Sequence, residues 1–218
     1  MKKSQDELVL AVPRKGVFAV GEFQGLVLAS SISGGAMLRY IFDTRHARFL
    51  PRSVAEEDPA WKQIIPYVVL HCDGEIFCYR RGQQSTETRL RTLQSVGLGG
   101  HIRHTDEGLF AAPGWASYHT AMEREMNEEV VLVEEVRERH LTALVNDETS
   151  PVGRMHLGLV HLWELWTPAV RAREPKIAEA HWESVAELAN LGALAFETWS
   201  QLVLAHWGEL RQQPGWRP

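Results

Sequence analysis

Residues 121–130 read Ala121-Met122-Glu123-Arg124-Glu125-Met126-Asn127-Glu128-Glu129-Val130, and this acidic stretch decides how the rest of the chain is interpreted. The spacing predicts an α-helix on which Glu125, Glu128 and Glu129 share one face, because they stand at i, i+3 and i+4. Like charges about 5.5 Å apart repel by about 3 kcal/mol at an effective dielectric constant of about 20. A divalent cation among them would replace this repulsion with attraction, and carboxylate oxygens are the ligands that Mg²⁺ and Mn²⁺ prefer.

A helix rich in glutamate can also be an ordinary solvated helix, and the residues before it help to decide between the two interpretations. A strand-like run from Thr92 to Leu98 leads directly into Gly99-Gly100. Two glycines let the backbone turn sharply and approach a ligand or a metal closely. We therefore favour a metal-binding helix over a solvated one.

The glycines and the helix together resemble the Nudix box, the signature of the Nudix hydrolases. Its pattern is Gly, five residues, Glu, seven residues, and then Arg-Glu-apolar-x-Glu-Glu-x-Gly-apolar. Residues 124–129 match the second half at every defined position, Leu132 matches the final apolar residue, and Gly99-Gly100 match the opening glycines. Residues 178–188 resemble the strand, tryptophan and short helix that often close a Nudix domain, so the resemblance covers roughly residues 64–190.

The chain departs from this pattern at the first glutamate. The position eight residues before Arg124 holds Ala116, and more residues separate the glycines from the helix than the pattern allows, which indicates an insertion. Asp106 or Glu107, within the insertion, could supply the missing carboxylate. Val131 stands where the family's glycine usually ends the helix.

The resemblance implies an α/β/α sandwich with a central mixed β-sheet. It also implies a metal-dependent hydrolase that cleaves a pyrophosphate bond in a nucleoside diphosphate linked to another moiety, or in a similar diphosphate compound. The implied cofactor is Mg²⁺ or Mn²⁺. The implied metal ligands are Glu125, Glu128, Glu129 and the carbonyl of Gly100. The implied catalytic residues are Glu128, Glu129 and Arg124, whose guanidinium would orient the carboxylates through charge-assisted hydrogen bonds.

Two other functions stay open at this point. Because Ala116 replaces the first glutamate, the chain could be a non-catalytic Nudix-fold module that binds a nucleotide or a protein partner. It could also be an unrelated α/β domain with an acidic helix and no metal. Metal-dependent turnover would distinguish the hydrolase from the binding module, and the lack of any effect of Mg²⁺ or Mn²⁺ on the melting temperature would favour the unrelated domain.

A basic cluster precedes the glycines. Arg80 and Arg81, followed by Arg89 and Arg91, either solubilise the surface or contact substrate phosphates, for which the fork of arginine is suited. Glu164 lies on a predicted strand and is a candidate outer metal ligand or general base, because Nudix enzymes often recruit such a residue outside the box. We group it with Arg80 and Arg81 as candidate substrate-binding residues.

Local patterns predict several other elements. Asp73-Gly74 predicts a tight hairpin turn, and large apolar groups at positions 196, 199, 203 and 207 predict a helix. A short helix is predicted to begin at Ile32. The predicted strands are residues 8–12, 64–71, 75–80, 140–145 and 155–165, and a last strand is expected to end near Trp182. Residues 45–59 are polar, residues 56–59 are expected to be a loop or the start of a helix, and residues 146–151 are expected to be a turn or loop.

The chain of 218 residues is long enough for one good core. We expect an N-terminal extension over residues 1–60 packed on the main domain, a Nudix-like domain over 61–190, and a C-terminal helix and tail over 191–218. A net charge of −5 argues against a nucleic-acid partner. The expected partner is a small-molecule diphosphate, in the first place a nucleotide, and the resemblance allows a homodimer.

The composition also bears on the compartment. No run of about 18 apolar residues predicts a membrane span, and Met1-Lys2-Lys3 is followed by polar residues rather than by the apolar run of a signal peptide. A cytoplasmic location is therefore expected. Cys72 and Cys78 flank the predicted hairpin turn and are expected to be two buried thiols, with a disulfide as the alternative.

Overall fold

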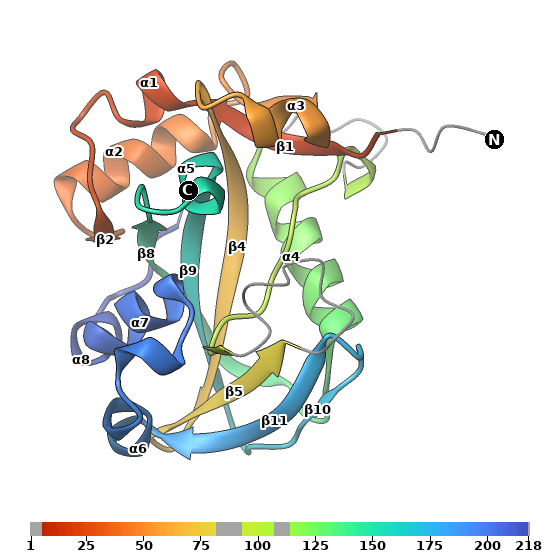
Figure 1. The fold of residues 1–218 in the computed structure, drawn as a ribbon, viewed down its shortest axis with the longest axis vertical. Coiled ribbons are helices and arrows are strands. Elements are labelled where there is room, and N and C mark those ends of the chain that lie inside the picture. The colour runs from red at the N-terminus through yellow and green to blue at the C-terminus, as the bar shows by residue number, and fades with distance from the viewer. Residues whose placement is uncertain (1–5, 82–92, 107–113, 218) are drawn as a thin grey trace.

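The computed structural model describes residues 6–81, 93–106 and 114–217 (Figure 1). Its main strands are β1 (Leu8–Pro13), β2 (Gly25–Leu28), β3 (Arg48–Pro51), β4 (Trp61–Cys72), β5 (Glu75–Arg81), β6 (Gln94–Ser95), β8 (Val136–Asn146), β9 (His156–Leu165) and β11 (Ile177–Ser184). Among the described residues these nine strands form one sheet in the order β11-β5-β4-β9-β8-β2, with β1 paired to β4, β3 paired to β1 and β6 paired to β5. The sheet is mixed, because β4 and β9 are parallel whereas β4 and β5 are antiparallel.

Helices cover both faces of this sheet. They are α1 (Arg14–Val17), α2 (Ile32–Ile41), α3 (Arg52–Glu57), α4 (Trp115–Glu129), α5 (Pro151–Met155), α6 (Val185–Asn190), α7 (Thr198–Ala205) and α8 (Trp207–Leu210). The apolar sides of α2 and α4 belong to one buried cluster, whereas α6, α7 and α8 contribute to a second one. Figure 1 shows α6, α7 and α8 gathered on the side of the molecule away from α4. The α/β/α sandwich with a central mixed sheet is thereby confirmed.

The two clusters follow from the alternation of side chains along the central strands. On β4, Ile64 and Val68 face the cluster that contains α4, whereas Tyr67 and Val69 face the cluster that contains α7. Successive residues of a strand point to opposite faces of its sheet, so a strand with apolar residues on both faces can support two cores. This explains why the long run from Trp61 to Cys72 is buried on both sides.

The predicted hairpin forms between β4 and β5. Asp73 and Gly74 both have positive φ, at 47° and 91°, as a two-residue turn of type I′ requires. Cys72 and Cys78 on the two strands are free and buried, so the prediction of two thiols is confirmed. The turn places β5 beside β6, which leads into Gly99-Gly100.

The first 60 residues contribute strands to the same sheet. Ala11 of β1 pairs with Gln63 of β4, and Gly25 of β2 pairs with Asn146 of β8. The division of the chain at residues 60 and 190 stays a prediction. Among the described residues, no helix is long and apolar enough to cross a membrane.

Several local predictions were wrong or incomplete. The helix α5 (Pro151–Met155) was not predicted: it begins at Pro151, expected as loop, and ends at Met155, expected as the first residue of a strand. Pro151 occupies its first turn, and the hydroxyl of Ser150 accepts a hydrogen bond from the amide of Gly153. Residues 56–59, expected as a loop or the start of a helix, instead contain the end of α3, which follows β3 directly. The strand-like run before the glycines yields only the short β6, and the predicted C-terminal helix is divided at His206 into α7 and α8.

Candidate active site

Helix α4 packs one side against the sheet and presents its acidic side to the loop that precedes it. We call residues 97–106 the box loop, and Glu125, Glu128 and Glu129 the box glutamates. Glu125 and Glu129 are each only 3% exposed, whereas Glu128 lies at the surface of the site. The helix is anchored by Tyr118 and Met122, which are buried in the core. The apolar positions therefore fix the rotation that brings the glutamates to the box loop.

The two glycines of the box loop allow it to approach α4. Gly99 has φ of +148°, and a Cβ added there would lie 1.9 Å from the carbonyl oxygen of Pro66. Its amide donates a hydrogen bond of 3.0 Å to Oε2 of Glu129. A Cβ added at Gly100 would lie 2.5 Å from Oε2 of Glu125. Glycine is therefore required at both positions for the buried carboxylates to lie against the loop backbone.

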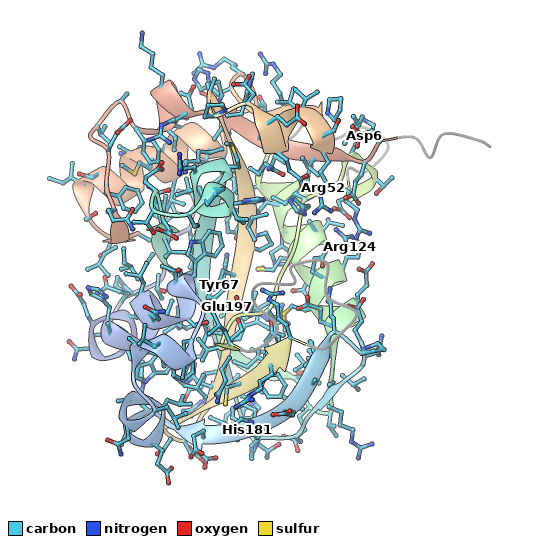
Figure 2. All side chains as sticks on the ribbon, in the orientation of Figure 1. Asp6, Arg52, Tyr67, Arg124, His181 and Glu197 are labelled. Atoms are coloured by element: carbon cyan, nitrogen blue, oxygen red, sulfur yellow. The ribbon has the colours of Figure 1, made fainter. Side chains whose placement is uncertain are left out.

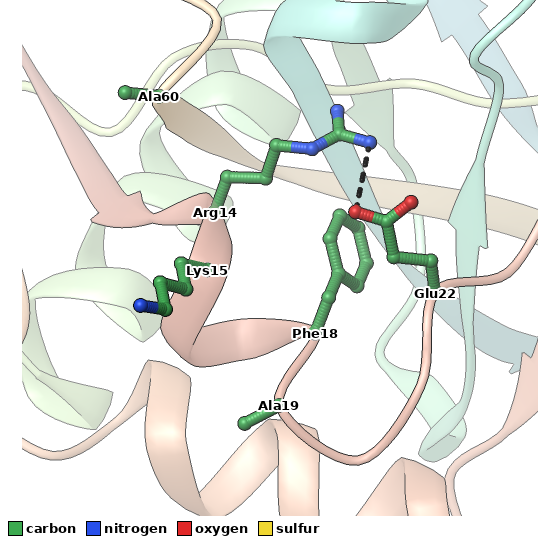
Figure 3. A pocket seen from close by; sticks show the side chains of 6 residues that line it. All are labelled: Arg14, Lys15, Phe18, Ala19, Glu22 and Ala60. Atoms are coloured by element: carbon green, nitrogen blue, oxygen red, sulfur yellow. Dashed lines mark hydrogen bonds and ion pairs between the residues drawn. The ribbon is translucent and has the colours of Figure 1, made fainter.

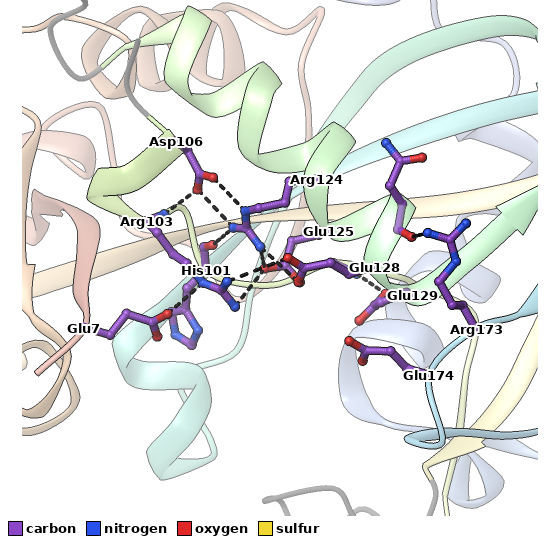
Figure 4. Close-up of polar contacts among 12 residues, drawn as sticks. Glu7, His101, Arg103, Asp106, Arg124, Glu125, Glu128, Glu129, Arg173 and Glu174 are labelled. Carbon is purple, nitrogen blue, oxygen red and sulfur yellow. Dashed lines mark hydrogen bonds and ion pairs between the residues drawn. The ribbon is translucent and has the colours of Figure 1, made fainter. Parts of the chain in front are cut away.

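Arg124 connects the box loop to the box glutamates (Figure 4). Its Nη1 donates to Glu125 at 2.6 Å and to Glu128 at 3.2 Å, and its Nη2 donates to the carbonyl of His101 at 3.0 Å. It also donates to Asp106, at 2.6 Å from Nε and 3.0 Å from Nη2. Burial alone would lower the pKa of Arg124, but the hydrogen bonds with Asp106 and Glu125 outweigh it and raise that pKa above its ordinary value.

Asp106 lies where a carboxylate was missing from the sequence pattern. Residues 101–105 separate it from Gly100, which is the five-residue spacing between the glycine and the first glutamate of the Nudix box. Its side chain is buried and is bound by Arg124 and by the amide of Arg103. The insertion therefore follows Asp106, and Ala116 lies within α4 itself. Glu107, the other candidate, lies outside the described residues.

The end of α4 is formed without the glycine of the family pattern. The helix ends at Glu129, and Val130 begins the short strand β7 (Val130–Leu132), which pairs with β10 (Val170–Ala172). The amide of Arg173, just after β10, donates a hydrogen bond of 2.8 Å to the carbonyl of Glu129. Pairing with β10 and this contact take the role of a glycine cap, so Val131 is accommodated as a strand residue.

Glu129 has an unusual environment for a carboxylate. Burial raises the pKa of Glu129 to about 7, and the charge of Lys176 offsets only part of this effect. The ammonium of Lys176 lies 3.0 Å from Glu129 and 2.8 Å from Glu174. No sequence pattern had pointed to Lys176, because it reaches the site from the segment before β11 through the tertiary fold alone.

The box glutamates are oxygen donors of the kind that Mg²⁺ and Mn²⁺ prefer, and the absence of a Cβ at Gly100 lets the carboxylate of Glu125 lie against the loop backbone. In the described ranges, however, no three His, Cys, Asp or Glu side chains converge as a metal cluster. Basic side chains lie against the carboxylates instead (Figure 4). The donor chemistry of the residues therefore fits a divalent cation, provided that a basic side chain gives way to it.

The other predicted site residues have partners outside the box. Arg81 forms an ion pair with Glu197, with contacts of 2.5 and 3.0 Å, and Arg80 lies 3.3 Å from Glu179. Glu164 lies 3.2 Å from Arg137. Their assignment to substrate binding stays a prediction, and Arg89 and Arg91 lie outside the described residues.

A buried polar network joins α7 to the start of the box loop. The hydroxyl of Ser200 lies 2.8 Å from that of Tyr67 and accepts a hydrogen bond of 3.1 Å from the amide of Val96. The amide of Glu197 donates to the carbonyl of Gln94 at 3.0 Å. Figure 2 shows Tyr67 and Glu197 close together in the middle of the molecule. The C-terminal helix therefore helps to hold β6 and the loop that follows it.

Two cavities lie elsewhere on the molecule. One, of about 470 Å³, is lined by Arg14, Phe18 and Glu22 among others (Figure 3), and Arg14 is paired there with Glu22 and Glu148. The other, of about 410 Å³, lies beside the start of α4 and is lined by residues that include Trp115 and Trp216. The lining of neither cavity includes a box glutamate.

Comparison with known proteins gives relatives along almost the whole chain. No family model matches it. The chain is 34% identical over 208 residues to Protein YmaB of Bacillus subtilis strain 168, and the alignment covers 91% of this chain and 96% of that protein. Among solved structures, Tm1382, which is assigned as a Nudix hydrolase, is similar with a TM-score of 0.76 and 28% identity over 94% of this chain and 100% of its own. DR0079 from Deinococcus radiodurans shares the fold, with a TM-score of 0.51 and 16% identity over 75% of this chain and 94% of its own.

Proposed function

The chain belongs to the Nudix hydrolase family, and from this membership we propose that it hydrolyses a pyrophosphate bond in a nucleoside diphosphate linked to another moiety, or in a similar diphosphate compound. The observation that carries the proposal is the joining of the box loop to the box glutamates through Asp106 and Arg124. The proposed cofactor is Mg²⁺ or Mn²⁺. The proposed substrate is a small molecule, and a homodimer and a cytoplasmic location stay predictions.

On this proposal the chain's own residues have distinct tasks. Glu125, Glu128 and Glu129, with the carbonyl of Gly100, would hold the divalent cation. When bound, the cation supplies polarisation of the phosphoryl oxygens and a water of lowered pKa. Arg124 positions two of the carboxylates through its hydrogen bonds, and Gly99 positions the third through its amide.

The alternative of a non-catalytic binding module rested on Ala116. That argument is weakened by Asp106, which provides Arg124 with a carboxylate partner from the box loop. An intact set of polar contacts around the glutamates favours a working site, because buried charges that lack partners destabilise a protein. Catalysis is therefore the better supported of the two functions.

The test is a phosphate-release screen of the purified protein against nucleoside diphosphate derivatives with Mg²⁺, with Mn²⁺ and with a chelator. We expect turnover only with metal, and a loss of about a hundredfold or more in E128Q, because each carboxylate ligand contributes directly to metal binding. E123Q is the matched control, since Glu123 lies on the same helix but pairs with Arg139 of β8. Equal turnover in the chelator, or unchanged turnover in E128Q, would contradict the proposal. No turnover on any compound, with melting still raised by a nucleotide, would favour the binding module.

A further inference from the structure

Arg103 is placed at the site by the N-terminal strand. The amide of Leu10 in β1 donates a hydrogen bond of 2.9 Å to the carbonyl of Ile102, and Val9 forms a β-bridge with Arg103. The amide of Arg103 donates to Asp106 at 2.7 Å. The backbone of Arg103 is therefore held from both sides, by a strand outside the Nudix resemblance and by the box loop itself.

The guanidinium of Arg103 lies among three carboxylates (Figure 4). It forms an ion pair of 2.6 Å with Glu7, the residue just before β1. Its terminal nitrogens lie 3.7 Å from Glu125 and 3.8 Å from Glu128. These last two distances are too long for hydrogen bonds, so Glu7 holds the side chain while the two box glutamates attract it only by charge.

Arg103 differs in this respect from the other basic groups at the site. The guanidinium of Arg124 donates hydrogen bonds to Asp106, Glu125 and Glu128, and Lys176 is shared between Glu129 and Glu174. Among the described residues, by contrast, the terminal nitrogens of Arg103 make no hydrogen bond, and 37% of its side chain is exposed. Within the part of the chain that the structure describes, these terminal nitrogens can therefore bind a new acceptor without giving up a hydrogen bond.

We propose that Arg103 is an exchangeable counter-ion of the box glutamates: a divalent cation displaces its guanidinium from Glu125 and Glu128, and the guanidinium, still tethered by Glu7, then binds a phosphate of the substrate. A metal ion and a guanidinium at the same two carboxylates repel each other, so occupancy by one weakens the attraction of the other. The fork of arginine matches a phosphate group and can donate two parallel hydrogen bonds to it. This proposal rests on the proposed hydrolase function and adds a substrate-positioning residue to it.

The proposal requires two effects of opposite sign in one variant. With Mn²⁺ as the probe and no substrate present, R103Q should bind the metal about three- to tenfold more tightly than the wild type, because a competing cation has been removed. With a turned-over diphosphate, the same variant should show KM raised about tenfold or more. A residue with a merely structural role would weaken both functions together.

Three further variants sharpen the test. R103K keeps the positive charge but loses the planar guanidinium that can donate two parallel hydrogen bonds. Compared with R103Q, its affinity for Mn²⁺ should therefore return towards that of the wild type, while its KM stays high. E7Q removes the ion pair between Glu7 and Arg103, so Arg103 is attracted only to Glu125 and Glu128. It then competes more strongly with the metal, and the affinity for Mn²⁺ should fall. R45Q, at an exposed arginine paired with Asp43, should change neither quantity. Mn²⁺ binding is measured by calorimetry and KM by phosphate release.

The outcomes separate this inference from the function on which it rests. Unchanged or weaker Mn²⁺ binding in R103Q would overturn the proposed role of Arg103 as a counter-ion. An unchanged KM in R103Q would overturn its proposed contact with a substrate phosphate. If the wild-type protein turns over a diphosphate with metal, the proposed hydrolase function stands, whatever the result for R103Q. Wild-type protein that binds no Mn²⁺ and turns over no diphosphate overturns the hydrolase and this inference together.

Discussion

Asp106 accepts two hydrogen bonds from Arg124, at 2.6 and 3.0 Å, although an insertion separates the box loop from helix α4. The pair connects the two halves of the box and, through the remaining donors of Arg124, positions Glu125 and Glu128. A carboxylate one methylene shorter than glutamate can make this contact because the box loop approaches α4 closely at Gly100.

The first prediction concerns this pair. D106N should lower the free energy of unfolding by about 1–3 kcal/mol, because the neutral amide offers one acceptor oxygen where the carboxylate offers two, and Arg124 loses its charged partner in the box loop. The value of kcat/KM should fall about tenfold or more, because Arg124, which positions Glu125 and Glu128, loses the carboxylate that holds it in place. Denaturant unfolding and phosphate release measure the two effects.

Two reciprocal variants identify which residue occupies the position of the first glutamate. D106E should retain most of the activity, whereas A116E combined with D106A should not restore it, because Ala116 is an exposed residue in the first turn of α4. Restoration by A116E would show that counting back from Arg124 finds the functional position, and that Asp106 only stabilises the loop.

The second prediction tests the approach of the box loop to α4. G100A should reduce metal-dependent turnover about tenfold or more while lowering the free energy of unfolding by only about 1 kcal/mol, because its Cβ meets the movable carboxylate of Glu125. G99A should be far more destabilising, because its Cβ would meet the backbone of Pro66. G208A is the control, since nothing lies within 4 Å of a Cβ at that exposed position. Full turnover in G100A would show that the position of the Glu125 carboxylate is unimportant for activity.

The sequence alone could predict the parts of the site that lie close together along the chain. The box glutamates follow from helical spacing, and the glycines follow from their place after a strand-like run. Counting back from Arg124 leads to Ala116 rather than to Asp106, because the insertion lengthens the chain between Asp106 and Arg124 although the two side chains are in contact. Counting forward from Gly100 would have indicated Asp106 alone.

The contacts that the sequence could not predict join distant segments. Glu7 and Lys176 reach the site from the N-terminal strand and from the segment before β11, and neither belongs to a local pattern. Arg81 was predicted from its charge, but its contact with Glu197 depends on how α7 packs against the sheet. Pairings of this kind are set by the tertiary fold, on which spacing along the sequence gives no information.

The third prediction concerns Arg81 and Glu197. The carboxylate of Glu197 is only 9% exposed and α7 packs beside β6, so we expect the pair to be coupled by about 1–3 kcal/mol in a double-mutant cycle. R81Q, E197Q and the double variant should be measured by denaturant unfolding. As a control, R80Q removes the neighbouring exposed arginine, which should have little effect on stability. Coupling near zero, together with a raised KM in R81Q, would instead support the assignment of Arg81 to substrate binding.

The fourth prediction concerns stability in acid and depends on His161, which is 3% exposed and lies 2.7 Å from the hydroxyl of Tyr118. Burial, with a smaller contribution from His119, lowers the pKa of His161 to about 3. The unfolded chain, with an ordinary histidine pKa of about 6.5, therefore binds one more proton between these values, so this contribution to stability is present above pH of about 6.5 and is lost as the pH falls towards 3. The loss approaches about 1.4 kcal/mol for each pH unit below 6.

The test is H161Q, which can still accept a hydrogen bond from Tyr118 but cannot titrate. Its free energy of unfolding should therefore depend less steeply on pH, by the slope that corresponds to about one proton. The measurement is denaturant unfolding from pH 7 to 4.5. An equally steep slope in H161Q would show that His161 does not titrate with unfolding.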